Sequence, residues 1–107
     1  MSSLGKVLRQ VQNQATTGNY LVSQHCQQEM AEEDIDIVDV IDTLISGTII
    51  ENYPEHRRGG CCLVNGVAGN GRPLHVVCTT ELPTLILITV YEPKSPKWLT
   101  SFQRRRL

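Results

Sequence analysis

Five side chains of this 107-residue chain have the types needed to cleave RNA without a metal ion. Cleavage at the 2′-hydroxyl requires a base that takes its proton, an acid that protonates the leaving 5′-oxygen, and a cation or hydrogen-bond donors that stabilise the phosphorane. Histidine suits both proton transfers because its pKa lies near neutrality, and arginine can grip a phosphate with two hydrogen bonds. The candidate catalytic residues are His25, Arg72, His75, Thr89 and Tyr91.

Each of these residues also has a purely structural interpretation. His25 follows an expected helix cap and is explained equally well as a surface residue. His75, in the middle of a predicted strand, is explained by a hydrogen bond to a neighbouring strand. Arg72 lies beside a predicted turn, and Thr89 and Tyr91 are strand-forming types. Both interpretations stay open at the level of residue type and spacing.

Further arginines occur in two short clusters outside the predicted helices and strands. One cluster lies in a loop rich in proline and glycine, and the other lies near the end of the chain. We predict that they bind the phosphates of the substrate, although a basic chain end is also commonly just solvated. The predicted substrate-binding residues are Arg57, Arg58, Arg104 and Arg105.

The four cysteines are interpreted as reduced, small buried side chains. Cys61 and Cys62 are adjacent, so a bond between them would close a strained ring, and the remaining spacings show no disulfide framework. There is no CxxC or HxxxH pair to start a zinc site. Phosphate-binding loops and dinucleotide-binding motifs are likewise missing from the sequence. We therefore expect neither a metal ion nor a cofactor.

The totals place the chain among ordinary globular proteins of one domain. Acidic and basic residues number 11 and 10, which gives a net charge of −1 and argues against binding nucleic acid by bulk electrostatics. The first residues lack the apolar stretch of a signal peptide. The longest apolar run, 85–90, is far shorter than the roughly 20 residues that span a membrane. We expect a cytoplasmic protein without membrane contact.

The first part of the chain has the apolar spacing of helices. Residues 1–19 are predicted to form an N-terminal helical extension, and Tyr20–Val22 a short extended segment. A second helix is predicted to begin after Ser23. A third is predicted to begin after Asp36 and to end at Gly47 in the left-handed conformation.

The apolar spacing then changes to the alternation typical of strands. Strands are predicted at residues 48–53, 61–67, 74–79 and 85–91, and Asn70-Gly71 predicts a type I′ hairpin turn. The predicted fold is one α+β domain over residues 1–107. Its N-terminal helices pack on one face of a four-stranded antiparallel β-meander.

Strand alternation also predicts which side chains face the helices. Leu74, Val76, Cys78, Ile86, Ile88 and Val90 are assigned to the helix side. His75, Val77, Thr79, Leu85, Leu87, Thr89 and Tyr91 are assigned to the open face. An open face that combines polar groups with exposed valine and leucine is typical of a dimer interface, a partner site or a substrate cleft.

Several short motifs follow one another in a fixed order within residues 20–106. They read Ser23-Gln24-His25, Gly47-Thr48-Ile49-Ile50-Glu51-Asn52-Tyr53-Pro54, Cys62-Leu63-Val64-Asn65-Gly66, Gly71-Arg72-Pro73-Leu74-His75-Val76-Val77, Ile88-Thr89-Val90-Tyr91-Glu92-Pro93, and Trp98 with Phe102, Arg104 and Arg105. In this order they resemble a bacterial family known only as a domain of unknown function. That family in turn resembles the RelE-like toxins and their relatives of the barnase, EndoU and colicin class.

The resemblance implies a fold and an activity. Such toxins are small helix-then-sheet ribonucleases that cleave RNA, some of them on the ribosome, with active sites on the sheet face away from the helices. Members often occur beside a small antitoxin, sometimes one with a zinc finger. By this resemblance His25, Arg72, His75, Thr89 and Tyr91 are the active-site positions of a metal-independent endoribonuclease.

One departure from the family pattern favours an alternative. Glu29 and Glu33 occupy positions where the family usually has arginine. Two carboxylates would repel a phosphodiester, each by about 1 kcal/mol across a solvated gap of several ångströms. The alternative is a non-catalytic RelE-like binding module, or a homodimer, that uses the open face of the sheet.

Overall fold

The computed structural model describes residues 3–55, 59–81 and 83–94. Within them the chain runs through α1 (Ser3–Thr16), β1 (Tyr20–Val22), α2 (Gln24–Glu33), α3 (Ile37–Ser46), β2 (Thr48–Tyr53), β3 (Cys61–Val67), β4 (Pro73–Thr79) and β5 (Leu85–Tyr91). The fold is mixed α and β, as predicted. The helices and the strands from β2 onward lie close to their predicted bounds.

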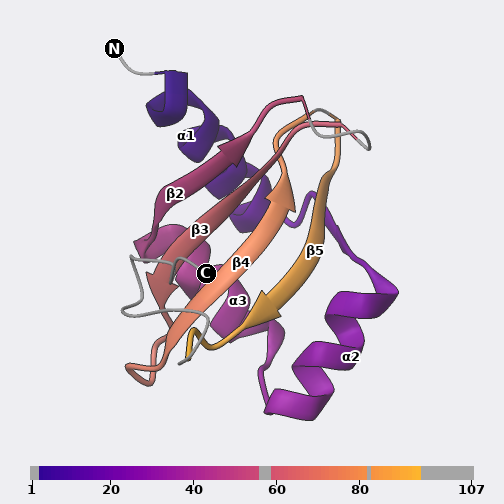
Figure 1. Ribbon diagram of the computed structural model, residues 1–107, viewed down its shortest axis with the longest axis vertical. Coiled ribbons are helices and arrows are strands. Elements are labelled where there is room, and N and C mark those ends of the chain that lie inside the picture. The colour runs from indigo at the N-terminus through magenta and orange to yellow at the C-terminus, as the bar shows by residue number, and fades with distance from the viewer. Residues whose placement is uncertain (1–2, 56–58, 82, 95–107) are drawn as a thin grey trace, which may run out of the picture.

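The sheet has five strands in the described residues, in the order β1-β5-β4-β3-β2 (Figure 1). Strands β2 to β5 form the predicted antiparallel series. The short segment β1 adds a fifth strand, which pairs in parallel with β5 through Tyr20 opposite Leu85. The prediction of a purely antiparallel four-stranded meander is therefore wrong. A strand of three residues has no readable alternation, and its partner is distant in the sequence.

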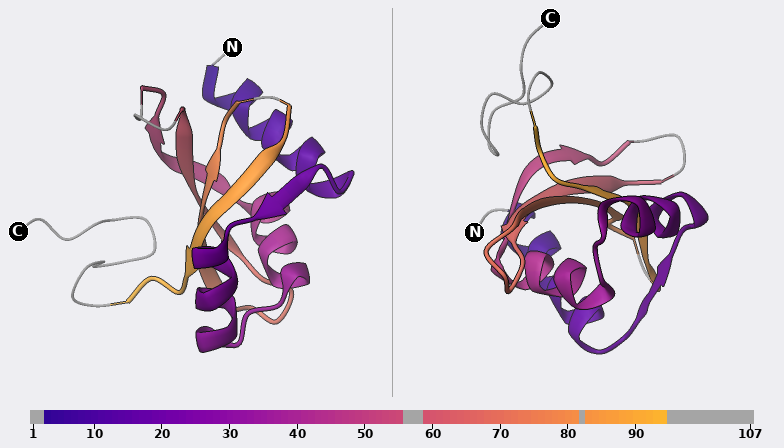
Figure 2. Two further views of the ribbon diagram at one scale, coloured as in Figure 1. Left: turned by 90° about the vertical axis from the view of Figure 1, so that its right-hand side faces the viewer. Right: turned by 90° about the horizontal axis from the view of Figure 1, so that it is seen from below.

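Two of the helices cover one side of the sheet. Figure 2 shows α1 and α3 on one face of the sheet, and the C-terminal end of β5 turns toward the other face. Helix α2 lies along β5, near the edge of the sheet. Val11 and Ala15 of α1 belong to the same buried cluster as Leu44 of α3 and the inward side chains of the strands. The N-terminal helix is thus part of the main hydrophobic core.

The helix caps follow the predicted residue types, with one exception. Ser23 is the N-cap of α2, and its Oγ accepts a hydrogen bond from the backbone N–H of Cys26 at 3.0 Å. Asp36 is the N-cap of α3, and its backbone N–H donates to the Asp39 carboxylate at 2.9 Å. Gly47 follows α3 with an extended φ of −92°, so the predicted left-handed conformation is wrong. Glycine is needed there because a Cβ would come within 2.6 Å of the Thr43 carbonyl oxygen.

The β3–β4 hairpin does not close with the type I′ turn predicted at Asn70-Gly71. The Ala68 N–H donates to Arg72 O at 2.9 Å, and the Gly71 N–H donates to Ala68 O at 2.9 Å. Among the loop residues only Gly71 has a positive φ, at 86°. This is a type I turn followed by a left-handed glycine, so the type I′ prediction is wrong. The glycine is still required at the position that the sequence indicated.

A β-bulge in β5 changes which of its side chains face the core. Val77 pairs with Thr89, whereas the next residue, Cys78, pairs with Leu87, so Ile88 has no partner of its own. Leu87 and Leu85 are therefore fully buried on the helix side, opposite to the alternation prediction. Thr89 and Tyr91 keep their predicted orientation because they follow the bulge.

The face away from the helices was predicted to combine polar groups with exposed valine and leucine, and part of its apolar surface is buried instead. Leu63 and Cys61 of β3 have their side chains on this face, and both are buried. Val77 of β4 is partly buried. Among the described helices, none is long and apolar enough to cross a membrane.

Gly66 lets β3 approach α3 closely, and its substitution provides a test of this packing. A Cβ at Gly66 would overlap the backbone carbonyl oxygen of Thr43, which cannot rotate away. We expect Gly66→Ala to lower the free energy of unfolding by about 2–3 kcal/mol in urea denaturation. Gly5→Ala is the control: its Cβ meets no atom within 4 Å, and alanine favours the helix by about 0.5–1 kcal/mol. Equal stabilities of the two variants would contradict the assigned packing.

Candidate functional site

Helix α2 takes the place of a neighbouring strand along the second half of β5. Strand β1 pairs with β5 only as far as Leu87, whose carbonyl accepts from the Ser23 N–H at 3.0 Å. The Ser23 hydroxyl then donates to the carbonyl of Ile88 at 2.9 Å. From this point on, side chains of the helix, and not a strand backbone, bond the edge of β5.

Two carboxylates of α2 continue this edge. Glu29 Oε1 accepts from the Val90 N–H at 3.1 Å, and Glu33 Oε1 accepts from the Glu92 N–H at 3.4 Å. Four residues of helix rise about 6 Å, while two residues of strand rise about 6.8 Å. The i, i+4 spacing of the two glutamates therefore matches the i, i+2 spacing of the two N–H groups.

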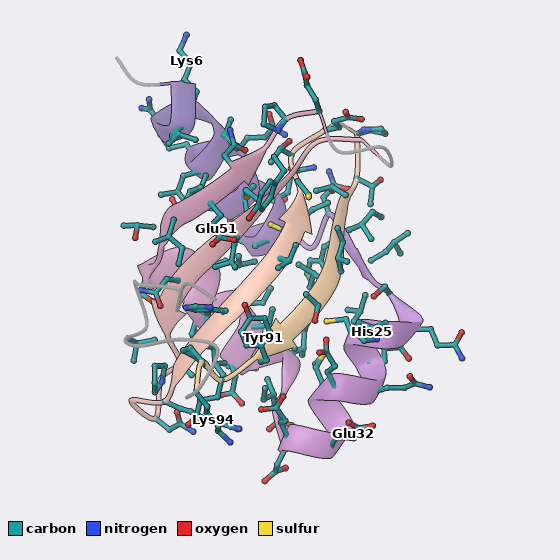
Figure 3. The ribbon with its side chains drawn as sticks, in the orientation of Figure 1. Lys6, His25, Glu32, Glu51, Tyr91 and Lys94 are labelled. Atoms are coloured by element: carbon teal, nitrogen blue, oxygen red, sulfur yellow. The ribbon has the colours of Figure 1, made fainter. Side chains whose placement is uncertain are left out.

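Glu29 also joins two of the predicted site residues. Its Oε1 accepts a hydrogen bond from Thr89 Oγ1, and it lies 3.4 Å from His25 Nε2. The His25 side chain is 67% exposed and that of Glu29 is 21% exposed, so the pair is reached from solvent. His25 at the start of α2 and Tyr91 at the end of β5 lie on these two neighbouring elements (Figure 3).

Glu29 was not among the predicted catalytic residues. A readable signal did exist, because a histidine and a glutamate at i and i+4 share one side of a helix. Its contact with β5 could not be read from the sequence. That contact depends on where α2 lies along the strand.

His75 and Tyr91 form a second pair, on the sheet itself. They are directly opposite each other on β4 and β5, and His75 Nδ1 lies 3.2 Å from the Tyr91 hydroxyl. Their rings meet edge to face, with centroids 5.3 Å apart and planes at 68°. The His75 side chain is 0% exposed, and Tyr91 is half-buried. Tyr91 is therefore the more exposed member of the pair.

Asn65 extends this pair into a polar row across three strands. It lies on β3 directly opposite His75 and is only 7% exposed. Within the described residues its Oδ1 has no hydrogen-bond partner. Sequence reasoning did not single out Asn65, because an asparagine within an apolar strand is recognised as part of a row only once the strand register is known.

Arg72 is held by carboxylates and does not project freely. Its Nε donates to Glu92 Oε1 at 2.7 Å, one terminal nitrogen donates to the Asp34 carbonyl at 3.2 Å, and the other lies 3.9 Å from Glu33 Oε1. The hydrogen bond that Arg72 donates to Glu92 raises the pKa of the guanidinium above its ordinary value. Arg72 thus ties the β3–β4 hairpin to the end of α2 and to the residue after β5.

The structure brings the predicted residues together in two groups. His25 and Thr89 meet through Glu29, and His75 meets Tyr91. Arg72 is engaged by its neighbouring carboxylates. The predicted substrate-binding residues Arg57, Arg58, Arg104 and Arg105 lie outside the described residues.

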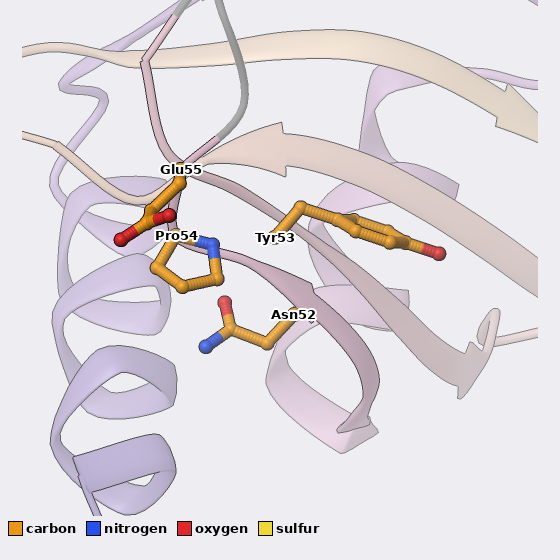
Figure 4. A pocket seen from close by; sticks show the side chains of 4 residues that line it. All are labelled: Asn52, Tyr53, Pro54 and Glu55. Carbon is orange, nitrogen blue, oxygen red and sulfur yellow. The ribbon is translucent and has the colours of Figure 1, made fainter.

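An open hollow lies elsewhere, at the end of β2. It is lined by Asn52, Tyr53, Pro54 and Glu55 (Figure 4). None of the predicted catalytic residues lines it. In the described part of the chain, no group of three or more His, Cys, Asp or Glu side chains is placed to hold a metal ion.

Comparison with known proteins identifies a family but no activity. The family model with the description "Domain of unknown function (DUF4258)" matches residues 22–92, more than half of the chain. The match covers α2 to β5 and leaves out α1. No curated protein and no solved structure matches the chain.

The edge role of Glu29 can be separated from its charge. Glu29→Ala removes the acceptor of the Val90 N–H, so we expect the free energy of unfolding to fall by about 1–2 kcal/mol in urea denaturation. Glu29→Gln keeps an acceptor oxygen at the same distance along the side chain, and its loss should be less than half as large. Equal losses in the two variants would show that charge, and not hydrogen bonding to β5, is what stabilises this edge.

The burial of His75 predicts a structural cost for its removal. We expect His75→Ala to lower the free energy of unfolding by about 2–4 kcal/mol, because it leaves a cavity and takes away a partner of Tyr91. Tyr91→Phe, which keeps the ring, should cost about 1 kcal/mol. Thermal or urea unfolding followed by circular dichroism would measure both. A His75→Ala variant as stable as the wild type would contradict the burial of this side chain.

Proposed function

This chain belongs to the family described as a domain of unknown function (DUF4258), and we propose that it is a metal-independent endoribonuclease. The observation that carries the proposal is the solvent-accessible pair formed by His25 Nε2 and Glu29 Oε1, 3.4 Å apart. RNA cleavage at the 2′-hydroxyl requires one group that takes a proton and one that gives a proton. An imidazole beside a carboxylate supplies both without a metal ion.

The proposed roles follow from the contacts of each group. Glu29 takes the proton of the 2′-hydroxyl, and the 2′-oxygen forms a bond to phosphorus. His25, in its protonated form, gives its proton to the leaving 5′-oxygen as the bond from phosphorus to that oxygen breaks. The products are a 2′,3′-cyclic phosphate and a 5′-hydroxyl. Thr89 and the Val90 N–H hold the Glu29 carboxylate in one orientation by bonding its Oε1.

Tyr91 is proposed to stabilise the charge on the phosphorane. It lies two residues after Thr89 on β5, so both side chains are on the face away from the helices. Its hydroxyl is a hydrogen-bond donor that His75 orients from the buried side. His75 is thus a positioning residue in this proposal, since a fully buried ring does not touch the substrate.

One cationic residue, Arg72, is given a different role from the one first expected. The guanidinium of Arg72 is engaged by Glu92, so we assign it to holding α2 against the hairpin and not to binding phosphate. Phosphate binding is left to Arg57, Arg58, Arg104 and Arg105. The resemblance to RelE-like toxins supports RNA as the substrate, on the ribosome or free, and a small antitoxin, with or without a zinc finger, as the protein partner.

A second candidate function is a non-catalytic RelE-like binding module or homodimer. Two observations favour it. The Arg72 charge is balanced by carboxylates, and Glu29 and Glu33 are both engaged in bonding the edge of β5. A helix whose acidic side chains are structural would bring negative charge toward the site without contributing to cleavage.

The ribonuclease proposal is tested with purified protein and total RNA in excess EDTA. We expect fragments that end in 2′,3′-cyclic phosphate, and at least about a hundredfold slower cleavage by His25→Ala and by Glu29→Gln. Glu32→Gln is the matched control, because Glu32 is an exposed glutamate on the same helix. It makes no contact with His25 among the described residues and should cleave like the wild type.

The outcomes separate the two candidate functions. Wild-type rates in both His25→Ala and Glu29→Gln would remove this pair from the mechanism. Intact RNA with every form, both free and on translating ribosomes, would favour the binding module. Light scattering on the same samples then shows whether the partner is a second copy of the chain.

A further inference from the structure

Two cysteines face each other in the core of the sheet. Cys62 on β3 is directly opposite Cys78 on β4, and their sulfur atoms are 3.9 Å apart. Both side chains are fully buried, on the side of the sheet covered by the helices. Both are free thiols in this structure.

The backbone at this position already suits a disulfide bond. Residues directly opposite in antiparallel strands have Cα atoms about 4.5–5.5 Å apart. Disulfides are formed across Cα distances of roughly 4.4–6.8 Å. The sulfur atoms need only approach to about 2.05 Å, a change that rotation of the two side chains can supply.

We propose that Cys62 and Cys78 are a reversible oxidation site, which a hydroperoxide converts to a disulfide across the two central strands. This inference is independent of the ribonuclease proposal. It rests on the register, the sulfur-to-sulfur distance and the burial of the pair.

The reaction proceeds in two balanced steps. The Cys62 thiolate attacks the hydroperoxide, whose O–O bond breaks, so that Cys62 becomes a sulfenic acid and the second oxygen leaves as water or an alcohol. The sulfur of Cys78 then attacks the Cys62 sulfur, the S–S bond forms as the S–O bond of the sulfenic acid breaks, and the departing hydroxide takes the Cys78 thiol proton and leaves as water. The hydroperoxide is reduced by the two electrons that the thiols lose. A thiol reductant reverses the change.

The electrostatics of the pair favour Cys62 as the first thiol to react. Its hydrogen bond with Cys78 lowers the pKa of Cys62. The same contact, together with burial, raises the pKa of Cys78 well above its ordinary value. Because the thiolate is the nucleophile, this difference orders the two steps.

The other two cysteines provide internal comparisons. Burial, together with the charge of Glu29, raises the pKa of Cys26 to about 11, so this thiol should react slowly. Cys61 is adjacent to Cys62, and its side chain is on the opposite face of β3. A bond between these neighbours would close a strained ring, whereas Cys78 lies across the ladder in a suitable position.

Burial also selects the oxidant. Hydrogen peroxide is hardly larger than water and can enter during brief local openings of the sheet. A bulky aromatic disulfide reagent should be excluded from the native protein. The cross-link encloses the β3–β4 hairpin from Cys62 to Cys78, so the oxidised protein should unfold at a temperature higher by roughly 5–15 °C.

The test uses the whole protein, treated with hydrogen peroxide and then alkylated to block the remaining thiols. Chymotrypsin cuts after Leu63 and Leu74 and so separates the two cysteines, whereas trypsin leaves the Arg72–Pro73 bond intact. We expect mass spectrometry to find Cys62 linked to Cys78, with Cys26 alkylated, and dithiothreitol to reverse both the link and the shift in unfolding temperature. Because Cys61 and Cys62 stay on one chymotryptic peptide, fragmentation of the linked peptides must assign the bond to Cys62.

Single substitutions sharpen the assignment. The cross-link should persist in Cys61→Ser and in Cys26→Ser, and it should be lost in Cys62→Ser and in Cys78→Ser. A cross-link that persists in Cys62→Ser, one that joins any other pair in the wild type, or the absence of any cross-link after peroxide treatment of the folded wild type would overturn the proposal.

Discussion

The bonding of α2 to the edge of β5 is the interaction on which the rest of this site depends. Strand β1 covers only the first part of that edge, and beyond it the backbone of β5 would present open N–H and C=O groups. Ser23, Glu29 and Glu33 supply the missing partners from side chains of the helix. The bonds fix how far along β5 the helix sits. They therefore also fix where His25 and Thr89 meet.

The carboxylate of Glu29 bonds the edge of β5 and can also accept a proton. All three contacts of Glu29 go to Oε1, while its Oε2 has no hydrogen-bond partner in the described part of the chain. The contacts to Oε1 orient the carboxylate, and Oε2 can still accept a proton. Glu29 can therefore act as a proton acceptor without a metal ion.

Much of the fold could be read from the sequence because the relevant signals are local. The apolar stripe of α3, the alternation of β2 to β4 and the glycine at the β3–β4 turn each specify their element within a few residues. The pairing of β1 with β5 could not be read, because a segment of three residues has no periodicity and its partner is distant in the chain. The bulge at Ile88 could not be read either. In the run Leu-Ile-Leu-Ile both faces of the strand carry apolar side chains, so alternation does not show which face is buried.

The candidate site was predicted by residue type, and its geometry depends on that hidden bulge. The five predicted residues do fall into two contacting groups, apart from Arg72, but the sequence showed neither the partner of Thr89 nor the burial of His75. The extra residue of β5, Ile88, allows Leu87 to be buried while Thr89 and Tyr91 stay on the opposite side. Thr89 then reaches Glu29 from the edge, while Tyr91 reaches His75 from the sheet. Without the bulge, burying Leu85 and Leu87 would turn Thr89 and Tyr91 into the core. The bulge therefore allows β5 to contribute to the hydrophobic core and to the candidate site.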